Sequence, residues 1–477
     1  MEKINYSDLQ FKCGLEIHQQ LPDKKLFCNC PCTITDEPAH FTINRKLKAL
    51  AGETGAIDIA ALHEQSKKKS FIYQGYNHLN CLVEIDEEPP HQVNENALHT
   101  ALLVSKMLHA TIVKEIIFMR KTVIDGSNVS GFQRTALIAT DGFIETSEGK
   151  IGIATVCLEE ESAKAVQRTP ECDTYNLSRL GIPLIEIATA PDIKTALGAK
   201  EAAEKIGMIL RSTNQVKRGL GSIRQDVNLS IKGLARVEIK GFQEIRSMPV
   251  VIDNEINRQF SLMQKGESLK PEVRKVEPDN TTTFLRPMPG AARMYPETDG
   301  EVIHLTEEFI ATLKIPELIN DKSQRLEQYG ISKELAEMLA KKDKVTFFET
   351  AIQKFKNLKP AYIAELLIPK LLEIKRKHNI NIDTITDDNI EQLLDKLNQN
   401  KITKESVEEL LVAFAKKEQI DFTKYTTASS DDIEQEIKKI IEENQGLQFG
   451  AIMHVVMAKY RGKVDGKLLS ELIKKYL

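Results

Sequence analysis

Two kinds of hydrophobic periodicity divide this chain of 477 residues into a strand-rich part and a helical part. Before Asp299, several segments alternate apolar and polar residues, which is the period of a β-strand with one buried face. In FKCGLEIHQQL, which starts at Phe11, the apolar side chains point one way, and Glu16 and His18 point the other. After Asp299, stretches such as DDIEQEIKKIIEE show helical spacing instead. The pattern predicts an α+β protein with a sheet domain followed by helices.

Local patterns add helices and a hairpin to the strand-rich part. Apolar residues recur at helical spacing in residues 95–110 and again in residues 193–212. The segments QDVNLSI and RVEIK each alternate, and a short glycine-containing turn separates them. We interpret this pair as a β-hairpin.

Composition places the chain among ordinary globular proteins. Apolar residues make up 41% and charged residues 28%, and the net charge of −4 gives no overall signal for nucleic-acid binding. The first residues lack the pattern of a signal peptide, and no apolar run reaches 18 residues. The chain has seven cysteines, an odd number that does not suggest a framework of paired disulfides. We therefore expect a cytoplasmic protein with reduced thiols.

Two local segments are strongly basic although the whole chain is not. Residues 341–377 carry ten basic and four acidic side chains, and residues 459–475 carry six and two. Each segment is either a phosphate-facing surface or a solvated helix face.

Glu16 and His18 are the first candidate site residues. They share one face of their predicted strand at a spacing of about 7 Å. A carboxylate and an imidazole in that arrangement suit a metal ion or a proton relay. An exposed polar strand face is the alternative.

More carboxylates occur in two later apolar strands. Three successive glutamates, 159–161, follow the strand IGIATV, and such a run repels itself unless cations or donors gather there. Their hard oxygens suit Mg²⁺, although the acidic start of a helix at Ser162 is an equal alternative. Glu186 lies inside the apolar strand GIPLIEIA. Because an unpaired buried carboxylate is costly, Glu186 needs a metal, a base or a structural salt bridge.

The predicted hairpin has a polar face of its own. Arg224, Asp226 and Asn228 share one face of the first strand, and Glu238 and Lys240 share a face of the second. This face suits contacts to a nucleotide, and a solvent-facing surface is the alternative. The chain has no P-loop and no G-x-G-x-x-G motif, so a nucleotide would bind by other means.

Three of the cysteines crowd together as Cys28, Cys30 and Cys32, and Cys81 is more distant. The spacing of Cys28 and Cys32 falls within that of zinc sites, but no second close pair exists. Free buried thiols are the alternative.

The segment RPMPGAARMYPETD, which ends at Asp299, has three prolines and a glycine. It cannot be regular structure throughout. With Arg286, Arg293 and Glu297 it is expected to form a rigid polar loop that either joins domains or lines a substrate site.

Several of these motifs occur in one order that resembles a known family. The segments GLEIH, KLFCNCP, LEEESAK, YNLSRLGIPLIEIATAPDI, GSIRQDVNLSI and RVEIKGFQE resemble the B/E subunit family of the tRNA-dependent amidotransferases. CLVEIDEEPPH and TTTFLRPMPGAARMYPETD look like the archaeal E type rather than the bacterial B type. The resemblance implies a mixed-sheet, cradle-type catalytic domain over residues 1–300, an all-α helical domain over residues 301–405 and a YqeY-like tRNA-binding tail over residues 406–477.

The resemblance also implies a reaction. ATP and Mg²⁺ convert the glutamate on misacylated tRNA(Gln) to a γ-phosphoryl ester, and ammonia then displaces phosphate to give Gln-tRNA(Gln). For the E type the ammonia comes from an asparaginase-like subunit, GatD, in a heterodimer or heterotetramer. One alternative is a B-type subunit that works with an amidase-signature subunit, also on Asp-tRNA(Asn). The other alternative is a non-catalytic tRNA-binding scaffold.

The family pattern assigns roles to particular residues. It implies His18, Glu160 and Glu186 as magnesium ligands with Glu16 beside them. The acidic run does not fix the register, so Glu159 is the alternative to Glu160. By the same resemblance, Arg224, Asp226, Asn228 and Lys240 would lie near the nucleotide or the acceptor end of the tRNA.

Two departures from the family pattern stand out. E-type chains usually carry an aspartyl-tRNA-synthetase-like insertion before the RPMPGAARMYPETD-like loop, and here only the short stretch 263–279 occupies that place. The insertion is therefore missing. B-type zinc sites use two cysteine pairs, and here the second pair is reduced to Cys81. This favours free thiols over zinc.

Overall fold

The computed structural model describes residues 4–51, 55–242, 244–290, 294–418, 420–425, 430–444, 446–460 and 466–477. It forms two compact units, Met1–Pro316 and Glu317–Leu477. The expected boundaries at residues 300 and 405 stay predictions. Within the described residues, no helix has the length and apolar character that crossing a membrane requires.

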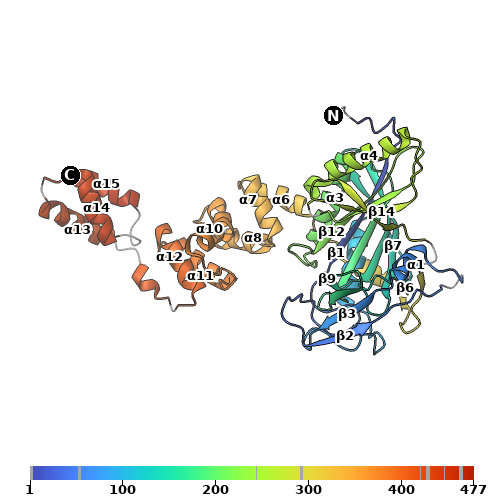
Figure 1. Cartoon of the computed structure of the whole chain (residues 1–477). Helices are drawn as coiled ribbons and strands as arrows, with labels where there is room; N and C mark the ends of the chain where they lie inside the picture. The colour runs from blue at the N-terminus through green and yellow to red at the C-terminus, as the bar shows by residue number, and fades with distance from the viewer. Residues whose placement is uncertain are drawn as a thin grey trace. The chain divides into compact units, whose positions relative to one another are not determined.

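A large mixed sheet forms the frame of the first unit (Figure 1). Neighbouring strands are antiparallel except for one parallel pair, β13 and β14. This confirms the predicted α+β class and the hairpin that β12 and β13 form. In spatial order the strands are β15 (Thr282–Pro287), β14 (Glu272–Val276), β13 (Val237–Lys240), β12 (Ile223–Ser230), β1 (Lys12–Gln20), β11 (Pro183–Thr189), β8 (Gly149–Glu160), β7 (Phe132–Thr146), β6 (Phe118–Thr122) and β16 (Met294–Pro296), with β4 (Thr111–Ile112) beside β7.

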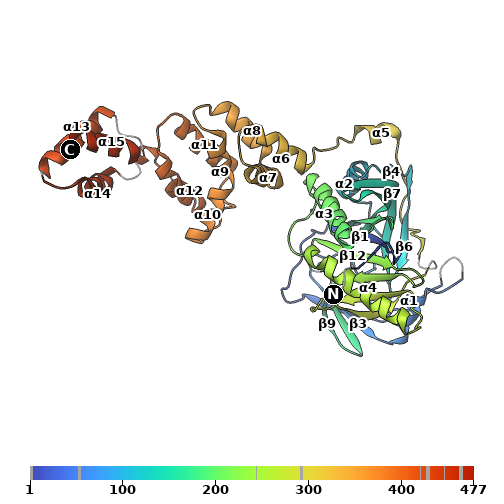
Figure 2. The same ribbon diagram turned by 90° about the horizontal axis from the view of Figure 1, so that it is seen from above.

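Helices cover the apolar face of this sheet. α2 (Glu95–Met107) packs on β7 and β8, α3 (Ala196–Ser212) packs on β1 and β7, and α4 (Met248–Gln264) lies against α3 (Figure 2). Both helices that periodicity predicted are thus confirmed. Each begins at a polar cap, because Asn94 accepts the Ala97 amide and Thr195 accepts the Gly198 amide. The candidate functional site lies on the opposite, polar face of the central strands.

Smaller elements complete the first unit. They are a four-stranded sheet of β2 (Phe41–Arg45), β3 (Ser70–Gly75), β10 (Cys172–Asn176) and β9 (Lys164–Arg168), the pair β17 (Ile303–His304) and β5 (Glu115–Ile116), and the helices α1 (Ile59–Ser66) and α5 (Glu307–Thr312). The alternative prediction of a helix that starts at Ser162 was wrong. Residues 164–168 form a strand instead, because β9 pairs with β10 and that ladder satisfies its backbone.

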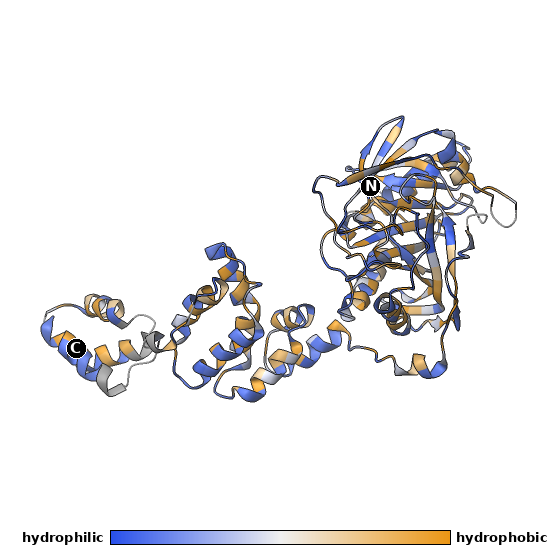
Figure 3. Ribbon diagram, turned by 90° about the horizontal axis from the view of Figure 1, so that it is seen from below, coloured by the Kyte–Doolittle hydropathy of each residue, from blue (hydrophilic) through white to orange (hydrophobic). Residues whose placement is uncertain are grey.

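The second unit is helical throughout its described elements. Apolar and polar residues alternate around its helices (Figure 3), so each helix has one face to bury. In its last part, Ile437, Val456 and Leu469 form one fully buried cluster. The helices are α6 (Ile319–Glu327), α7 (Lys333–Lys341), α8 (Val345–Lys354), α9 (Pro360–Leu367), α10 (Pro369–His378), α11 (Asp387–Asn398), α12 (Val407–Ala415), α13 (Ser430–Glu443), α14 (Phe449–Tyr460) and α15 (Gly466–Tyr476).

Candidate active site

Strand register brings polar side chains from separate parts of the chain onto one face of the sheet. On β1, His18 lies opposite Glu186 of β11 and Arg224 of β12, and Glu16 lies opposite Asp226 of β12. Directly opposed residues project their side chains from the same face. The alternate residues, such as Ile17, are fully buried on the helix-covered side. The face predicted for Glu16 and His18 is therefore a continuous polar surface across several strands.

His18, Glu159 and Glu186 form a compact cluster on this polar face. Their ligand atoms lie within 4.8 Å of one another. The His18 Nε2 atom is 3.2 Å from Glu186 Oε2 and 3.8 Å from Glu159 Oε1. All three side chains are at least four-fifths buried. One imidazole nitrogen and two carboxylates so arranged can hold a divalent cation.

The structure brings Glu159, and not Glu160, into this cluster. Successive residues of a strand point to opposite faces, so only one of the two glutamates can face His18. Glu160 points to the other side, where its carboxylate accepts the Arg134 backbone amide at 3.2 Å and lies 3.5 Å from the Arg134 guanidinium. Burial raises the pKa of Glu160, and Arg134 opposes that effect. Glu160 is thus the acid of a buried ion pair behind the sheet.

Lys121 is a site residue that sequence reasoning missed. Its ammonium lies 2.6 Å from Glu159 Oε2 and 3.5 Å from Glu186 Oε2, so it bridges the two carboxylates. Thr135 donates a further hydrogen bond of 3.1 Å to Glu159. The short strand FMRKT carries no motif that marks Lys121, and its position depends on the pairing of β6 with β7.

Charges in the cluster perturb one another. Burial alone would raise the pKa of Glu186, but Lys121 and the hydrogen bond with His18 bring it well below its usual range. Burial acts to lower the pKa of His18, and the hydrogen bond and charge of Glu186 outweigh it, so that pKa is raised. Glu186 is therefore anionic in this arrangement. The sequence predicts that Glu186 needs a metal ion, a base or a salt bridge. In the structure its partners are the basic side chains of His18 and Lys121.

A second acidic group lies beside the first on the same face. Oxygen atoms of Glu16, Asp226 and Glu238 lie within 4.8 Å of one another. Lys240 forms an ion pair of 2.6 Å with Asp226 and a second ion pair with Glu238. Burial, with the nearby charges of Glu186 and Glu238, raises the pKa of Glu16 to about 7. This crowding of carboxylates favours a cation here as well.

The remaining candidates on the polar face have different surroundings. Arg224 makes a two-pronged ion pair with Glu161, at 2.7 and 2.9 Å, and Gln20 donates to the same carboxylate at 3.0 Å. Arg224 therefore anchors the end of β8. Asn228 lies opposite Gly14 of β1. Among the described residues, no hydrogen bond engages its side-chain amide.

Comparisons with known proteins follow the same division of the chain. A family model described as the GatB/GatE catalytic domain matches residues 11–311, and one described as the GatB domain matches residues 346–477. This chain belongs to the GatB/GatE family. The polar sheet face with both acidic groups lies wholly inside the part that matches the catalytic domain of the family.

Curated relatives in the GatB/GatE family extend over the whole chain. The E subunit of the glutamyl-tRNA(Gln) amidotransferase of Methanocaldococcus jannaschii is 36% identical, with 100% of this chain and 99% of the relative covered. Proteins of the same name from Sulfurisphaera tokodaii and Methanosarcina barkeri are 35% and 34% identical. These alignments cover 100% of this chain in both cases, and 100% and 99% of the relatives.

This member of the GatB/GatE family is shorter than those relatives. The alignment with the Methanocaldococcus protein has 627 positions against 477 residues here, so about 150 positions have no counterpart in this chain. In this chain the stretch 263–279 consists of the end of α4, an irregular connection over residues 265–271, strand β14 and the start of a tight turn. That turn is closed by the Glu277 amide, which donates to the Thr281 carbonyl at 2.9 Å. The stretch leads into an ordinary hairpin of β14 and β15.

The cysteine group of this GatB/GatE chain differs from its predicted composition. Cys28, Cys30 and Cys81 lie together with Glu84, and their ligand atoms are within 4.8 Å of one another. Cys28 donates to Glu84 at 2.8 Å. Cys32 is outside this group, with its carbonyl bound by Lys217. Three sulfurs and one carboxylate are four potential zinc ligands, but they are not one of the cysteine and histidine sets of structural zinc sites.

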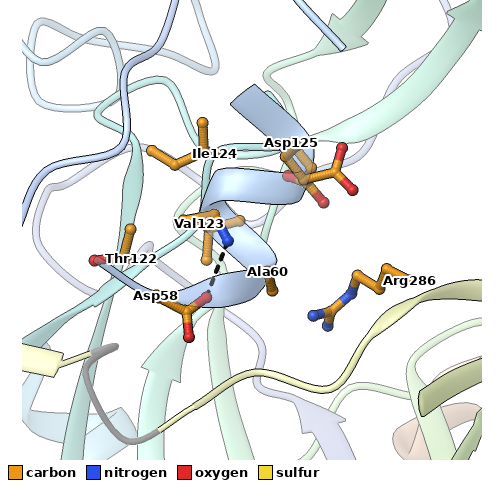
Figure 4. A pocket seen from close by; sticks show the side chains of 9 residues that line it. Asp58, Ala60, Thr122, Val123, Ile124, Asp125 and Arg286 are labelled. Carbon is orange, nitrogen blue, oxygen red and sulfur yellow. Dashed lines mark hydrogen bonds between the residues drawn. The ribbon is translucent and has the colours of Figure 1, made fainter. Parts of the chain in front are cut away.

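The proline-rich loop connects separate strands of the first unit. Arg120 of β6 and Arg134 of β7 both donate to Glu297, and Arg120 also binds Asp299 at 3.0 Å. At its other end, Arg286 lines a small cavity of about 40 Å³ beside the start of α1 (Figure 4). Arg293 lies outside the described residues. In the described part, the loop ties the two edges of the sheet domain to α1 and β6.

Proposed function

We propose that this chain converts Glu-tRNA(Gln) to Gln-tRNA(Gln) in two steps that use ATP and Mg²⁺. In the first step, a γ-carboxylate oxygen of the tRNA-borne glutamate attacks the γ-phosphorus of ATP, and ADP leaves. In the second step, ammonia attacks the activated carbonyl carbon, and inorganic phosphate leaves as the amide forms. Membership of the GatB/GatE family and the names of the relatives support an amidotransferase role.

The cluster of His18, Glu159 and Glu186 is the observation that carries this proposal. A carboxylate and a triphosphate repel each other, so their reaction requires a cation that neutralises the transferring phosphoryl group. Magnesium typically takes one or two protein carboxylates plus substrate phosphates. Glu159 and Glu186 offer those carboxylates, and His18 completes the set. Bound there, Mg²⁺ would stabilise the charge that develops on the phosphoryl oxygens.

Neighbouring side chains have matching tasks in this proposal. Glu16, Asp226 and Glu238 form the second acidic group, which could hold a further cation beside the first. Lys240 holds Asp226 and Glu238 in place by its ion pairs. Arg224 holds Glu161, and thereby the strand end that carries Glu159.

Matched substitutions on β8 and β11 test the metal assignment. Glu159→Gln and Glu186→Gln should each lower tRNA-dependent ADP formation by at least a hundred-fold. Each substitution removes a carboxylate ligand of the metal ion, and a weakly held ion stabilises the transferring phosphoryl group less. The neighbouring Glu160→Gln changes the same residue type one position away but on the other face. It should keep most of the activity. If Glu160→Gln were inactive and Glu159→Gln active, the proposed ligand set would be wrong.

The ammonia requires a partner in this proposal. The relatives are named as subunits, which supports a complex with other chains. We infer that an asparaginase-like subunit of the GatD type supplies the ammonia. Co-purification from the native source tests this, since an amidase-signature partner would support the B-type alternative instead. Glutamyl-tRNA binding without any ATP-dependent product would support the scaffold alternative.

A further inference from the structure

Two histidines and a glutamate meet on the surface of the first unit, at the four-stranded sheet. One potential ligand atom from each of Glu37, His40 and His78 lies within 4.8 Å of the others. Glu37 and His40 come just before β2, and His78 follows β3, which pairs with β2 (Figure 1). None of these side chains takes part in the reaction proposed above or belongs to the cysteine group.

The spacing of the three side chains is close to that of ligands around one metal ion. Zinc holds nitrogen and oxygen ligands at about 2.0–2.2 Å, so two ligands of a tetrahedral site lie about 3.4 Å apart. His78 Nε2 already lies 3.3 Å from Glu37 Oε1. The ring centroids of His40 and His78 are 5.5 Å apart. Because all three side chains are exposed, small rotations bring His40 to the same ion.

Hydrogen bonds fix the backbone that carries both histidines. The His40 amide donates to the Gly75 carbonyl at 2.9 Å, which joins the start of β2 to the end of β3. In the turn after β3, the Asn80 amide donates to the Tyr76 carbonyl at 2.9 Å, and the buried Asn80 side chain accepts the Tyr76 amide at 3.0 Å. Ligands on a backbone that is already ordered lose less entropy when an ion binds.

Glu37 is positioned by a second set of contacts. The Thr35 hydroxyl accepts the Glu37 amide at 3.2 Å, and the Thr35 carbonyl accepts the Asn176 side chain at 2.8 Å. The same Asn176 amide group donates to the Tyr76 hydroxyl at 2.8 Å. The Tyr76 ring in turn lies edge-on to His40, with 6.0 Å between the ring centroids. Buried Asn176 therefore supports both sides of the group.

Metal binding at His40 exchanges a hydrogen bond. The Asn77 amide donates to His40 Nδ1 at 3.2 Å, so in the free protein the ring proton is on Nε2. An ion either takes Nδ1 in place of this amide or takes Nε2 after the ring proton has moved to Nδ1. In both cases the Asn77 amide turns to water, which is accessible because Asn77 is exposed. The net loss is therefore small.

The donor atoms select the class of cation. Imidazole suits Zn²⁺, Cu²⁺ and Ni²⁺, whereas Mg²⁺ prefers a shell of oxygen ligands. Two histidines and one glutamate also occur together in zinc sites that keep a fourth position for water. We propose that Glu37, His40 and His78 bind one divalent transition-metal ion of the Zn²⁺ class, which joins the segment before β2 to the turn after β3. This proposal does not depend on the proposed function.

Calorimetric titration of Zn²⁺ into the full chain tests the site, with excess Mg²⁺ present to occupy sites of oxygen ligands. The wild-type chain should show a binding event that His78→Ala and His40→Ala each weaken at least ten-fold, since even the loss of a residue that only orients a ligand costs about 10–100-fold. His304→Ala is the matched control. His304 is likewise exposed and lies 3.5 Å from Glu115, but it belongs to no group of three potential ligands in the described part of the chain.

Thermal unfolding gives a second measurement on the same proteins, after circular dichroism has verified their folding. An ion that binds only the folded state raises the unfolding midpoint. Zn²⁺ should raise it less in His78→Ala and His40→Ala than in wild type, and equally in wild type and His304→Ala. The cysteine group is the same in all four proteins, so any Zn²⁺ held there cancels in these comparisons. Unchanged Zn²⁺ affinity in both His78→Ala and His40→Ala would overturn the proposal, as would a binding event that excess Mg²⁺ abolishes.

Discussion

At the scale of single residues, Lys121 is the side chain that most changes the interpretation of the site. Glu159 and Glu186 carry like charges on neighbouring strands, and the Lys121 ammonium lies between them at 2.6 and 3.5 Å. An ammonium in that place offsets their repulsion and competes with any metal ion for the same oxygens. Metal binding to the cluster therefore has to weaken these two ion pairs.

Removing this lysine should strengthen metal binding and weaken catalysis. Lys121→Met takes away a positive charge a few ångströms from the cation, which is worth roughly 1 kcal/mol or more near a protein surface. We expect the half-saturating Mg²⁺ concentration to fall about ten-fold, while the rate at saturating Mg²⁺ falls as well. A Mg²⁺ titration of tRNA-dependent ADP formation measures both. Lys114→Met, at an exposed lysine paired with Glu307, is the control, and an equal Mg²⁺ response in the two variants would contradict this role.

The limits of sequence reasoning at this scale are physical. Glu16, His18 and Glu186 were expected to converge, and the structure brings them to one face because their strands pair in register. Glu159 and Glu160 could not be separated, because a shift of one residue moves a strand side chain to the opposite face. Lys121 has no local signal at all, since its place depends on which strands become neighbours.

At the scale of elements, local rules predicted the helices and not the sheet order. α2 and α3 have clear periodicity and polar caps, which are properties of short segments. β1 pairs with β11 and β12, more than 160 residues further along the chain, and no local pattern contains that information. For residues 164–168, the pairing of β9 with β10 prevailed over the local pattern of a helix start.

The cap of α3 offers a test at this scale. Thr195 accepts the Gly198 amide at 2.9 Å, and the helix packs on β1. Thr195→Ala should lower the free energy of unfolding by about 1 kcal/mol, the usual cost of losing a side-chain cap. Thr195→Ser keeps the accepting hydroxyl and should keep most of the stability. Urea unfolding of both variants measures this, and equal losses would show that the methyl group rather than the cap matters.

The contact between α10 and α12 should depend on pH. Hydrogen bonds from Lys377, His378 and Lys370 lower the pKa of Glu408 from its ordinary value of 4.5 to about 2. A lowered pKa stabilises the folded state above pH 4.5, and this contribution is lost as the pH falls toward 2. Because the group is near solvent, the contribution is below about 1 kcal/mol. Urea unfolding of wild type and Glu408→Gln should differ most at pH 6, and the difference should shrink as the pH falls from 4.5 toward 2, whereas the exposed Glu405→Gln should match wild type throughout.

At the scale of the whole molecule, we expect the second unit to carry most of the tRNA binding, because the family pattern places a tRNA-reading insertion where this chain has only a short stretch. About 150 positions of the relatives are absent, and the place where the insertion is expected is a closed hairpin. The sheet domain has both acidic groups that the proposed chemistry uses. The basic stretches 341–377 and 459–475 belong to the helical unit.

A chain that ends at Pro316 should separate these two tasks. The first unit has its own sheet and core, so we expect this truncated chain to fold and to bind Mg²⁺ and AMP-PNP like the full chain. Its affinity for tRNA(Gln) should fall by at least ten-fold, and the dependence of that affinity on salt should become less steep, because each lost phosphate contact lowers the slope. Filter binding between 50 and 200 mM salt, a range in which such contacts respond strongly, measures both quantities. If the truncated chain kept full affinity with an unchanged slope, the sheet domain alone would hold the tRNA, and the basic stretches would be solvated helix faces.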